Sequence, residues 1–256
     1  MGIIILILKI ILILGVLVAI YFLISYCVFK FVQKYRNSNM TITAHSGCNG
    51  TELNSMASLE EGYNSGADIL EFDLNFNKYG VPYLCHDELK GLEIKLEEAF
   101  IFLVNNQNVK ANIDVKKTDN MPAVFQLINK YNLSNRVFFT GVKEEFVEAV
   151  RTGCPGIEYY LNYKPEFLKI HCQQYINELM NKVKDCSAVG INMRHYYLSG
   201  KLVKTFHEQN LLVSVWTVND RYFMQRAIYY GADNITTKNP MKLKRLIGER
   251  NNIKKA

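Results

Sequence analysis

The stretch I-L-E-F-D-L-N-F at residues 69–76 combines the features of a buried strand with two acidic residues. Its apolar residues suit a strand that is covered on both faces, as in a parallel sheet. Glu71 and Asp73 are two positions apart, and side chains two apart on a strand point to the same face. The stretch therefore predicts an interior strand that presents two carboxylates together.

Seven further runs rich in Val, Ile, Phe or Tyr resemble this strand, and amphipathic helical patterns separate them. This alternation, with no second domain, predicts an α/β fold of the (β/α)₈ type, a TIM barrel. A doubly wound open sheet is the alternative, but it usually has fewer strands, and no dinucleotide-binding glycine fingerprint follows the first strand. We expect strands at 41–46, 69–76, 109–116, 136–141, 156–162, 188–194, 211–218 and 234–237. We expect helices at 55–65, 95–106, 121–132, 143–152, 175–185, 199–209, 221–230 and 241–250.

The amino-terminal segment is a separate feature, because residues 3–29 are almost wholly apolar and carry Lys9 as their only charge. A helix of this length can cross a bilayer core of about 30 Å. A cleaved signal peptide is the alternative, but its apolar core is only about 7 to 15 residues long. The sequence therefore predicts a transmembrane anchor at 1–29, a juxtamembrane linker at 30–40 and the barrel at 41–250.

Charge and cysteine content bear on location and partners. Lys30, Lys34 and Arg36 follow the apolar run, so the positive-inside rule slightly favours a cytoplasmic barrel on a single-pass membrane protein. The six cysteines contain no C-x-x-C pair, which is typical of free thiols and of a reducing compartment. The net charge of +6 fits an anionic substrate or a membrane surface. No zinc-finger spacing or arginine-rich arm indicates a nucleic-acid partner.

The predicted strand ends carry the candidate chemistry, since the active-site groups of a TIM barrel gather at the carboxyl ends of its strands. His45 ends the first predicted strand, and His86 and Asp87 follow soon after the second. The third strand carries Asp114 and Lys116, again two positions apart and on one face. The strand before the last ends in W-T-V-N at 216–219.

These residue types suit phosphodiester chemistry. Three carboxylates that converge on one barrel mouth repel one another unless a cation joins them, and Mg²⁺ or Ca²⁺ prefers such oxygens. A nearby lysine suits a phosphate, and two histidines can act as base and acid near neutral pH. Taken singly, a buried acid is often an ion-pair partner and a histidine at a strand end is more often structural. Their grouping at the ends of three neighbouring strands favours a catalytic site.

Eight motifs occur in a fixed order along the predicted barrel. They are H-S-G at 45–47, L-N-S at 53–55, G-A-D at 66–68, E-F-D at 71–73, C-H-D at 85–87, N-I-D-V-K at 112–116, W-T-V-N at 216–219 and G-A-D-N-I-T-T-K-N-P at 231–240. In this order and spacing, the chain resembles the glycerophosphodiester phosphodiesterase family over residues 41–240.

The resemblance implies metal-dependent hydrolysis of a glycerophosphodiester, or of a lysophospholipid-like phosphodiester, to an alcohol and glycerol phosphate. In the family, a substrate hydroxyl attacks the phosphorus, the alcohol leaves, and water opens the cyclic phosphate. The resemblance implies one divalent cation, Mg²⁺ or Ca²⁺, and a role for each of seven residues. Glu71, Asp73 and Asp114 would hold the ion, His45 and His86 would be general base and general acid, and Lys116 and Trp216 would bind the substrate.

Two positions depart from the family pattern. Ser46 stands where the family has arginine, and Leu53 stands where it has glutamate. The joint loss of opposite charges suggests that the two residues are partners in the family, and Lys116 or Arg194 could supply the missing positive charge. The connection at 87–95 is short, which implies a more open site.

Two alternative functions stay open at this stage. One is a related phospholipase of the same barrel, acting on phosphoinositides or sphingomyelin-type lipids. The other is a non-catalytic, membrane-anchored protein that binds a phosphodiester, which the two departures favour. The presence of both histidines and all three carboxylates favours an enzyme.

Overall fold

The computed structural model describes residues 9, 11–21, 40–87, 91 and 93–253. The chain divides into two compact units, Met1–Arg36 and Asn37–Ala256, which we treat separately. The predicted linker at 30–40 lies outside the described residues except for its last residue.

The described residues of the second unit form nine strands, of which eight run parallel and close into a barrel. Closure occurs because β1 pairs with β9 on one side and with β2 on the other. The remaining strand, β3, pairs antiparallel with β2. The strands are β1 (Thr41–Ala44), β2 (Ile69–Phe76), β3 (Pro82–Leu84), β4 (Lys110–Val115), β5 (Val137–Val142), β6 (Tyr159–Asn162), β7 (Gly190–Arg194), β8 (Leu212–Trp216) and β9 (Asn234–Thr237).

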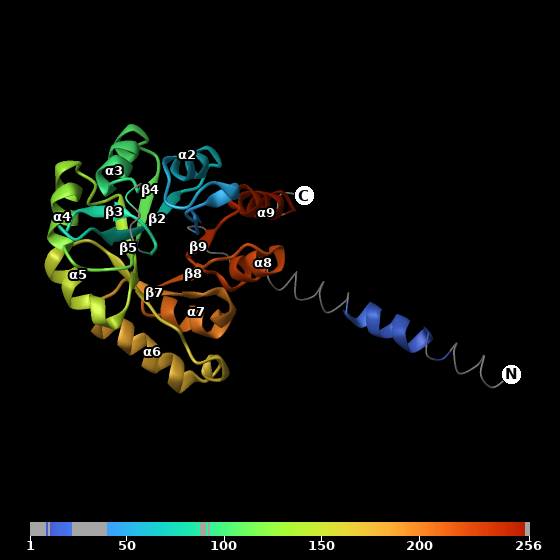
Figure 1. Ribbon diagram of the computed structural model, residues 1–256. Coiled ribbons are helices and arrows are strands. Elements are labelled where there is room, and N and C mark those ends of the chain that lie inside the picture. Colours follow the sequence, from blue (N-terminus) through green and yellow to red (C-terminus); the bar gives the residue numbers. More distant parts are fainter. Residues whose placement is uncertain (1–8, 10, 22–39, 88–90, 92, 254–256) are drawn as a thin grey trace. The chain divides into compact units, whose positions relative to one another are not determined.

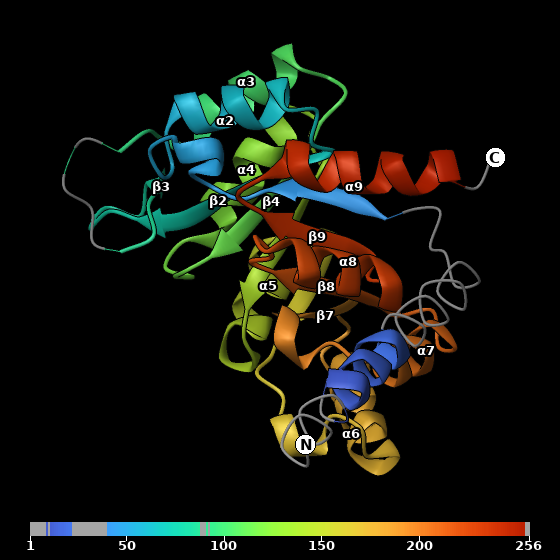
Figure 2. The ribbon, with the colours of Figure 1, turned by 90° about the vertical axis from the view of Figure 1, so that its right-hand side faces the viewer.

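The described part of this unit has eight α-helices. They form a ring around the barrel strands (Figure 1), and Figure 2 shows the same strands from the side. Several helices begin at a residue whose side chain accepts a free backbone N–H, as Ser55, Asn120, Ser199 and Asp220 do. The helices are α2 (Met56–Asn64), α3 (Leu96–Asn105), α4 (Met121–Lys130), α5 (Val147–Gly153), α6 (Gln173–Asp185), α7 (Gly200–His207), α8 (Arg221–Tyr230) and α9 (Pro240–Ile253). Short 3₁₀ helices are η1 (Cys48–Gly50), η2 (Glu144–Phe146), η3 (Phe167–Lys169) and η4 (His195–Tyr197).

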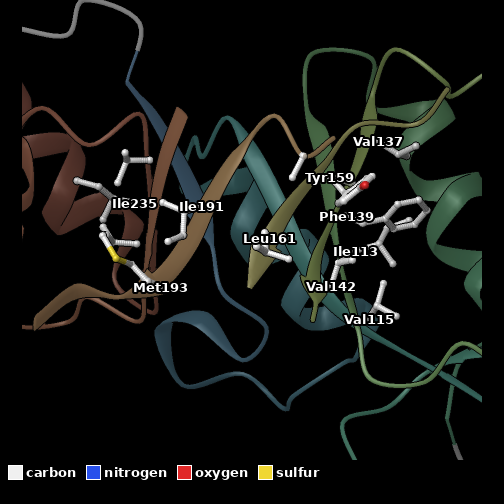
Figure 3. Close-up of a cluster of buried hydrophobic side chains, with 14 of the residues drawn as sticks. Ile113, Val115, Val137, Phe139, Val142, Tyr159, Leu161, Ile191, Met193 and Ile235 are labelled. Carbon is white, nitrogen blue, oxygen red and sulfur yellow. The ribbon is translucent and has the colours of Figure 1, made fainter. Parts of the chain in front are cut away.

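The hydrophobic core lies between the barrel wall and the helices. Strand residues such as Ile113, Phe139, Leu161 and Ile191 are fully buried and belong to one continuous apolar cluster with helix side chains. Figure 3 shows part of this cluster along neighbouring strands. Burial of each such side chain contributes about 1.5–3 kcal/mol relative to exposure, so this layer is a main source of stability.

The alternate strand positions face the barrel interior, and many of them are polar. Thr43 donates a hydrogen bond of 2.7 Å to Oδ1 of Asn234, whose Nδ2 donates to Oγ of Ser214 at 3.0 Å. All three residues are buried. TIM-barrel interiors are more often filled by Val, Ile and Leu, so this barrel replaces part of that filling with hydrogen bonds between strands.

The TIM-barrel prediction is confirmed, and the predicted strands and helices lie within a few residues of those observed. The sequence analysis missed β3, which has three residues, P-Y-L at 82–84. A run this short shows no periodicity, and β3 is stabilised by pairing with the last residues of β2.

The prediction of a single-pass membrane protein with an amino-terminal transmembrane helix is contradicted. In the first unit, residues 11–21 are helical. In the part of the chain that the structure describes, no helix combines the length and the hydrophobicity that crossing a membrane requires.

An ion pair at the end of α7 makes the stability of the barrel depend on pH. Nε2 of His207, at the end of α7, lies 2.8 Å from Oδ2 of Asp233, which also accepts the N–H of Val213 at 2.7 Å. The hydrogen bond to Asp233 raises the pKa of His207, and partial burial only partly offsets it. The stabilisation is therefore complete below the unfolded histidine pKa of about 6.5 and is lost as pH rises through the higher folded value.

We expect the urea midpoint of the full chain to fall between about pH 6.5 and 8, and His207→Gln to flatten that fall. The matched control is His171→Gln, which removes an exposed histidine. An equal pH dependence in the wild-type protein and His207→Gln would show that this pair does not contribute.

Candidate active site

A cavity of about 610 Å³ opens at the carboxyl ends of the barrel strands. The structure brings all seven residues singled out from the sequence to this one cavity. They are His45, Glu71, Asp73, His86, Asp114, Lys116 and Trp216. Their convergence follows from the fold, because parallel strands deliver their carboxyl ends to the same edge of the barrel.

Three carboxylates form the most strongly charged part of the cavity. Asp73 and Asp114 lie opposite each other in the β2–β4 register, and Glu71 is two residues earlier on β2. One oxygen from each of the three lies within 4.8 Å of the others. Burial, followed by the negative charges of Asp73 and Asp114, raises the pKa of Glu71 well above its ordinary value.

Lys116 lies directly against this cluster. Its Nζ is 2.9 Å from Oδ1 of Asp73 and contacts Oδ2 of Asp114 as well. Burial disfavours the charged ammonium, but Asp114 and Asp73 outweigh it, so the pKa of Lys116 is raised. The positive charge of Lys116 is therefore already engaged by carboxylates.

The carboxylate cluster fits a hard divalent cation. Its donors are three carboxylate oxygens on neighbouring strands, and such oxygens are the ligands that Mg²⁺ and Ca²⁺ prefer. The mutual repulsion that raises the pKa of Glu71 is the repulsion that a bound cation would relieve. Glu71, Asp73 and Asp114 could thus hold one such ion.

The two histidines occupy different depths of the cavity. Nδ1 of His45 lies 2.5 Å from the carbonyl oxygen of Ser46, so Nδ1 carries the proton and Nε2 is left as an acceptor. Burial lowers the pKa of His45. His86 is at the rim, where its side chain is 57% exposed and its Nδ1 lies 2.8 Å from Oδ1 of Asp87.

Ser46 and Asn54 form hydrogen bonds that hold two of the carboxylates. The N–H of Ser46 donates to Oε2 of Glu71 at 2.7 Å, and Nδ2 of Asn54 donates to Oδ2 of Asp73 at 2.8 Å. Oδ1 of Asn54 accepts the backbone N–H of Asp73, and Oγ of Ser46 accepts that of Asn54. The sequence analysis assigned no role to Asn54, although it is the middle residue of the L-N-S motif at 53–55. Leu53 itself is half-exposed.

The opposite wall of the cavity, from β5 to β8, was largely missed at the sequence level. It presents amides, a hydroxyl and cations instead of carboxylates. The residues that line it include Thr140, Asn162, Lys164, Asn192, Arg194 and Trp216. Isolated Asn, Thr and Lys residues near strand ends give no sequence signal until the fold brings them together.

Comparison with known proteins identifies the family. The model of the glycerophosphoryl diester phosphodiesterase family matches residues 45–92 and 92–242, which is most of the barrel. The chain belongs to this family. The resemblance inferred from the motifs is thereby confirmed, as is the prediction of a phosphodiester-hydrolysing enzyme.

Solved structures of similar fold include several glycerophosphodiester phosphodiesterases. One, described as putative, is from Silicibacter pomeroyi, with a TM-score of 0.71 and 16% identity over 86% of this chain and 96% of that one. Another is from Parabacteroides distasonis, with a TM-score of 0.69 and 19% identity over 83% and 98%. A phosphodiesterase from Oleispira antarctica, in complex with the product sn-glycerol-3-phosphate, has a TM-score of 0.68 and 15% identity over 85% and 99%. A search of curated proteins finds no match to the chain.

In this glycerophosphoryl diester phosphodiesterase, Gly141 makes room for Asp114. Gly141 has a positive φ of 72° and lies where the register of β5 against β6 shifts. A Cβ at this position would lie 2.5 Å from the carbonyl oxygen of Val115 and 2.7 Å from Oδ1 of Asp114. Both the backbone conformation and the space therefore require glycine beside this carboxylate.

Gly141→Ala should lower the free energy of unfolding by about 2–3 kcal/mol and displace Asp114, because it adds a clash to the cost of a left-handed backbone. Urea unfolding measures the first effect. The matched control is Gly156→Ala, since Gly156 also has a positive φ of 80° but a Cβ there would meet open space. Equal destabilisation by the two variants would rule out the proposed role of close packing against Asp114.

Proposed function

We propose that this enzyme hydrolyses a glycerophosphodiester to an alcohol and glycerol phosphate in a reaction that depends on one divalent cation. The observation that supports the proposal is the grouping of three carboxylates, a lysine and two histidines around one cavity. The product complex of the Oleispira antarctica phosphodiesterase, which has the same fold, is consistent with it.

In this proposal Glu71, Asp73 and Asp114 hold the cation, either Mg²⁺ or Ca²⁺. When bound, the ion supplies Lewis acidity to the phosphoryl group and lowers the pKa of an attacking hydroxyl. Lys116, at the edge of the same cluster, donates to a non-bridging phosphoryl oxygen and stabilises the charge that develops there. Ser46 and Asn54 keep two of the carboxylates oriented through their hydrogen bonds.

The histidines carry the proton transfers. His45 presents an unprotonated Nε2, because its Nδ1 donates to the Ser46 carbonyl, and it takes the proton of the attacking substrate hydroxyl. His86, oriented by Asp87 at the open rim, gives a proton to the oxygen of the leaving alcohol. Water then opens the resulting cyclic phosphate: His86 takes a proton from the water and His45 returns one to the released hydroxyl.

A lysophospholipid-like diester is also a candidate substrate, and the rim of the cavity supports it. Phe167 and Leu168 in η3 are 62% and 93% exposed, which is unusual for apolar side chains of this size. The ring of Phe167 lies 6.5 Å, centroid to centroid, from that of Tyr197, which lines the cavity. An acyl chain that leaves the cavity could therefore lie on this apolar edge.

Removal of metal should abolish hydrolysis, because the single positive charge of Lys116 does not suffice to neutralise three carboxylates and the phosphate together. The test uses the purified chain, EDTA treatment, re-addition of Mg²⁺ or Ca²⁺, and detection of glycerol phosphate released from glycerophosphocholine and from its lysolipid counterpart. Calorimetry should show that Asp114→Asn weakens Mg²⁺ binding at least about tenfold, whereas Asp119→Asn, at an exposed acid outside the cavity, should not. Full activity in protein shown to be metal-free would overturn this assignment.

His45→Ala and His86→Ala should each lower kcat by about 10² or more, since each removes one proton-transfer group. Stability should change little in His86→Ala, because its side chain is 57% exposed at the rim of the cavity; urea unfolding checks that His45→Ala, at a less exposed side chain, is also folded. His171→Ala, at an exposed histidine outside the cavity, is the control. A variant that retains near-normal turnover would exclude that histidine from the mechanism, and retention by both would favour a role in binding alone.

A further inference from the structure

The wall of the cavity opposite the carboxylates carries polar groups that the proposed reaction leaves unused. Asn162 on β6 lies opposite Asn192 on β7 in the parallel register. Lys164 and Arg194 follow these two residues by two positions, and all four line the cavity. Neighbouring strands thus each place a cation above an amide on this wall.

The hydrogen bonds beneath the wall fix the orientation of Asn192. The N–H of Gly141 can only donate, so the Asn162 atom 2.9 Å from it is the acceptor Oδ1. That same oxygen accepts Nδ2 of Asn192 at 2.8 Å. Oδ1 of Asn192 is therefore the free end of the chain of hydrogen bonds. This oxygen is buried, and Asn192 as a whole is only 4% exposed. The oxygen has no hydrogen-bond partner among the residues that the structure describes.

Trp216 and Arg194 complete this wall. Nε1 of Trp216, which can only donate, is also buried and has no hydrogen-bond partner in the described parts of the chain. Arg194 lies opposite Trp216 in the β7–β8 register, and its guanidinium is 5.3 Å from the centre of the indole ring. This stacking orients Arg194 while leaving its N–H donors available.

The cationic side chains of the cavity differ in whether they have a carboxylate partner. Lys116 is engaged by two carboxylates, and Lys143 lies 3.7 Å from Glu145. Lys164 and Arg194, by contrast, form an ion pair with none of the carboxylates in the described residues. The single negative charge of a phosphodiester would be met by the cation and Lys116, so these two residues remain available for another anion.

We infer that the preferred substrate is a glycerophosphodiester whose headgroup is a polyol that carries its own phosphate. Hydroxyls of the headgroup would donate to Asn192 and accept from Trp216, and its phosphate would bind Arg194 and Lys164. The inference rests on the proposed function, since it names the headgroup for the same site. A cationic headgroup such as choline is disfavoured by the same two cations.

The test measures kcat/KM of the full chain with Mg²⁺ for three diesters that differ in headgroup charge. Glycerophosphoinositol 4-phosphate should exceed glycerophosphoinositol by about tenfold, as expected for charge-assisted hydrogen bonds, and glycerophosphocholine should be the poorest. Equal values, or a preference for the choline diester, would overturn the inference while leaving the proposed hydrolysis intact.

Two variants test whether the preference for a phosphorylated headgroup comes from the cations of this wall. Arg194→Gln and Lys164→Gln should each lower the ratio of kcat/KM for the phosphorylated over the unphosphorylated inositol diester by about tenfold. Lys110→Gln removes the same charge from an exposed lysine at the first residue of β4, at the other end of the barrel, and should leave the ratio unchanged. Loss of the preference in Lys110→Gln, or its retention in both cavity variants, would contradict the assignment.

Binding separates failure of the inference from failure of the proposed function. If no diester is cleaved, the proposed hydrolysis is wrong, and calorimetry with glycerophosphoinositol 4-phosphate and Mg²⁺ still tests the wall. A Kd that rises about tenfold in Arg194→Gln would support the inference. An unchanged Kd in both Arg194→Gln and Lys164→Gln would refute it.

Discussion

The repulsion among Glu71, Asp73 and Asp114 is the constraint on which the rest of the site depends. Three carboxylates whose oxygens lie within 4.8 Å of one another would separate if they were free to move. Strand pairing between β2 and β4 holds their backbones, and hydrogen bonds from Ser46 and Asn54 hold two of the side chains. The barrel wall thus holds the negative charges close together. This arrangement favours a bound cation, and such a cation could in turn bind a phosphate.

The two faces of the barrel strands have different roles: one contributes to stability and the other forms the candidate site. The outward face is apolar and packs against the helices, whereas the inward face carries hydroxyls, amides and acids. The alternation along one strand, as in Glu71, Phe72 and Asp73, places both functions in a run of eight residues. The interior can be polar without loss of the fold because the outward side chains form a continuous apolar core and many of the inward polar groups hydrogen-bond to one another.

Much of this organisation could be predicted from local sequence, because strand period and order along the chain are local properties. Glu71 and Asp73 could be placed together because side chains two apart on a strand share a face. The contact of Asn54 with Asp73 and the space that Gly141 leaves for Asp114 could not be predicted from local sequence. Each depends on a residue at least 19 positions away along the chain. The prediction of an anchor rested on hydropathy alone, and among the described residues no helix has both the length and the hydrophobicity that crossing a membrane requires.

The replacement of the family arginine by Ser46 has a physical explanation in the distribution of charge. An arginine at position 46 would place a cation next to Glu71, whereas the buried Ser46 offers Glu71 only its backbone N–H. That hydrogen bond lowers the pKa of Glu71, but burial and the charges of Asp73 and Asp114 outweigh it and raise the pKa. In the proposed mechanism, a divalent cation would supply the positive charge that Ser46 does not bring to this side of the cavity. Arg194, across the cavity on β7, carries a positive charge without a carboxylate partner in the described structure. Arg194 thus adds positive charge on the β7 side of the cavity, opposite the carboxylates, where the proposed headgroup would lie.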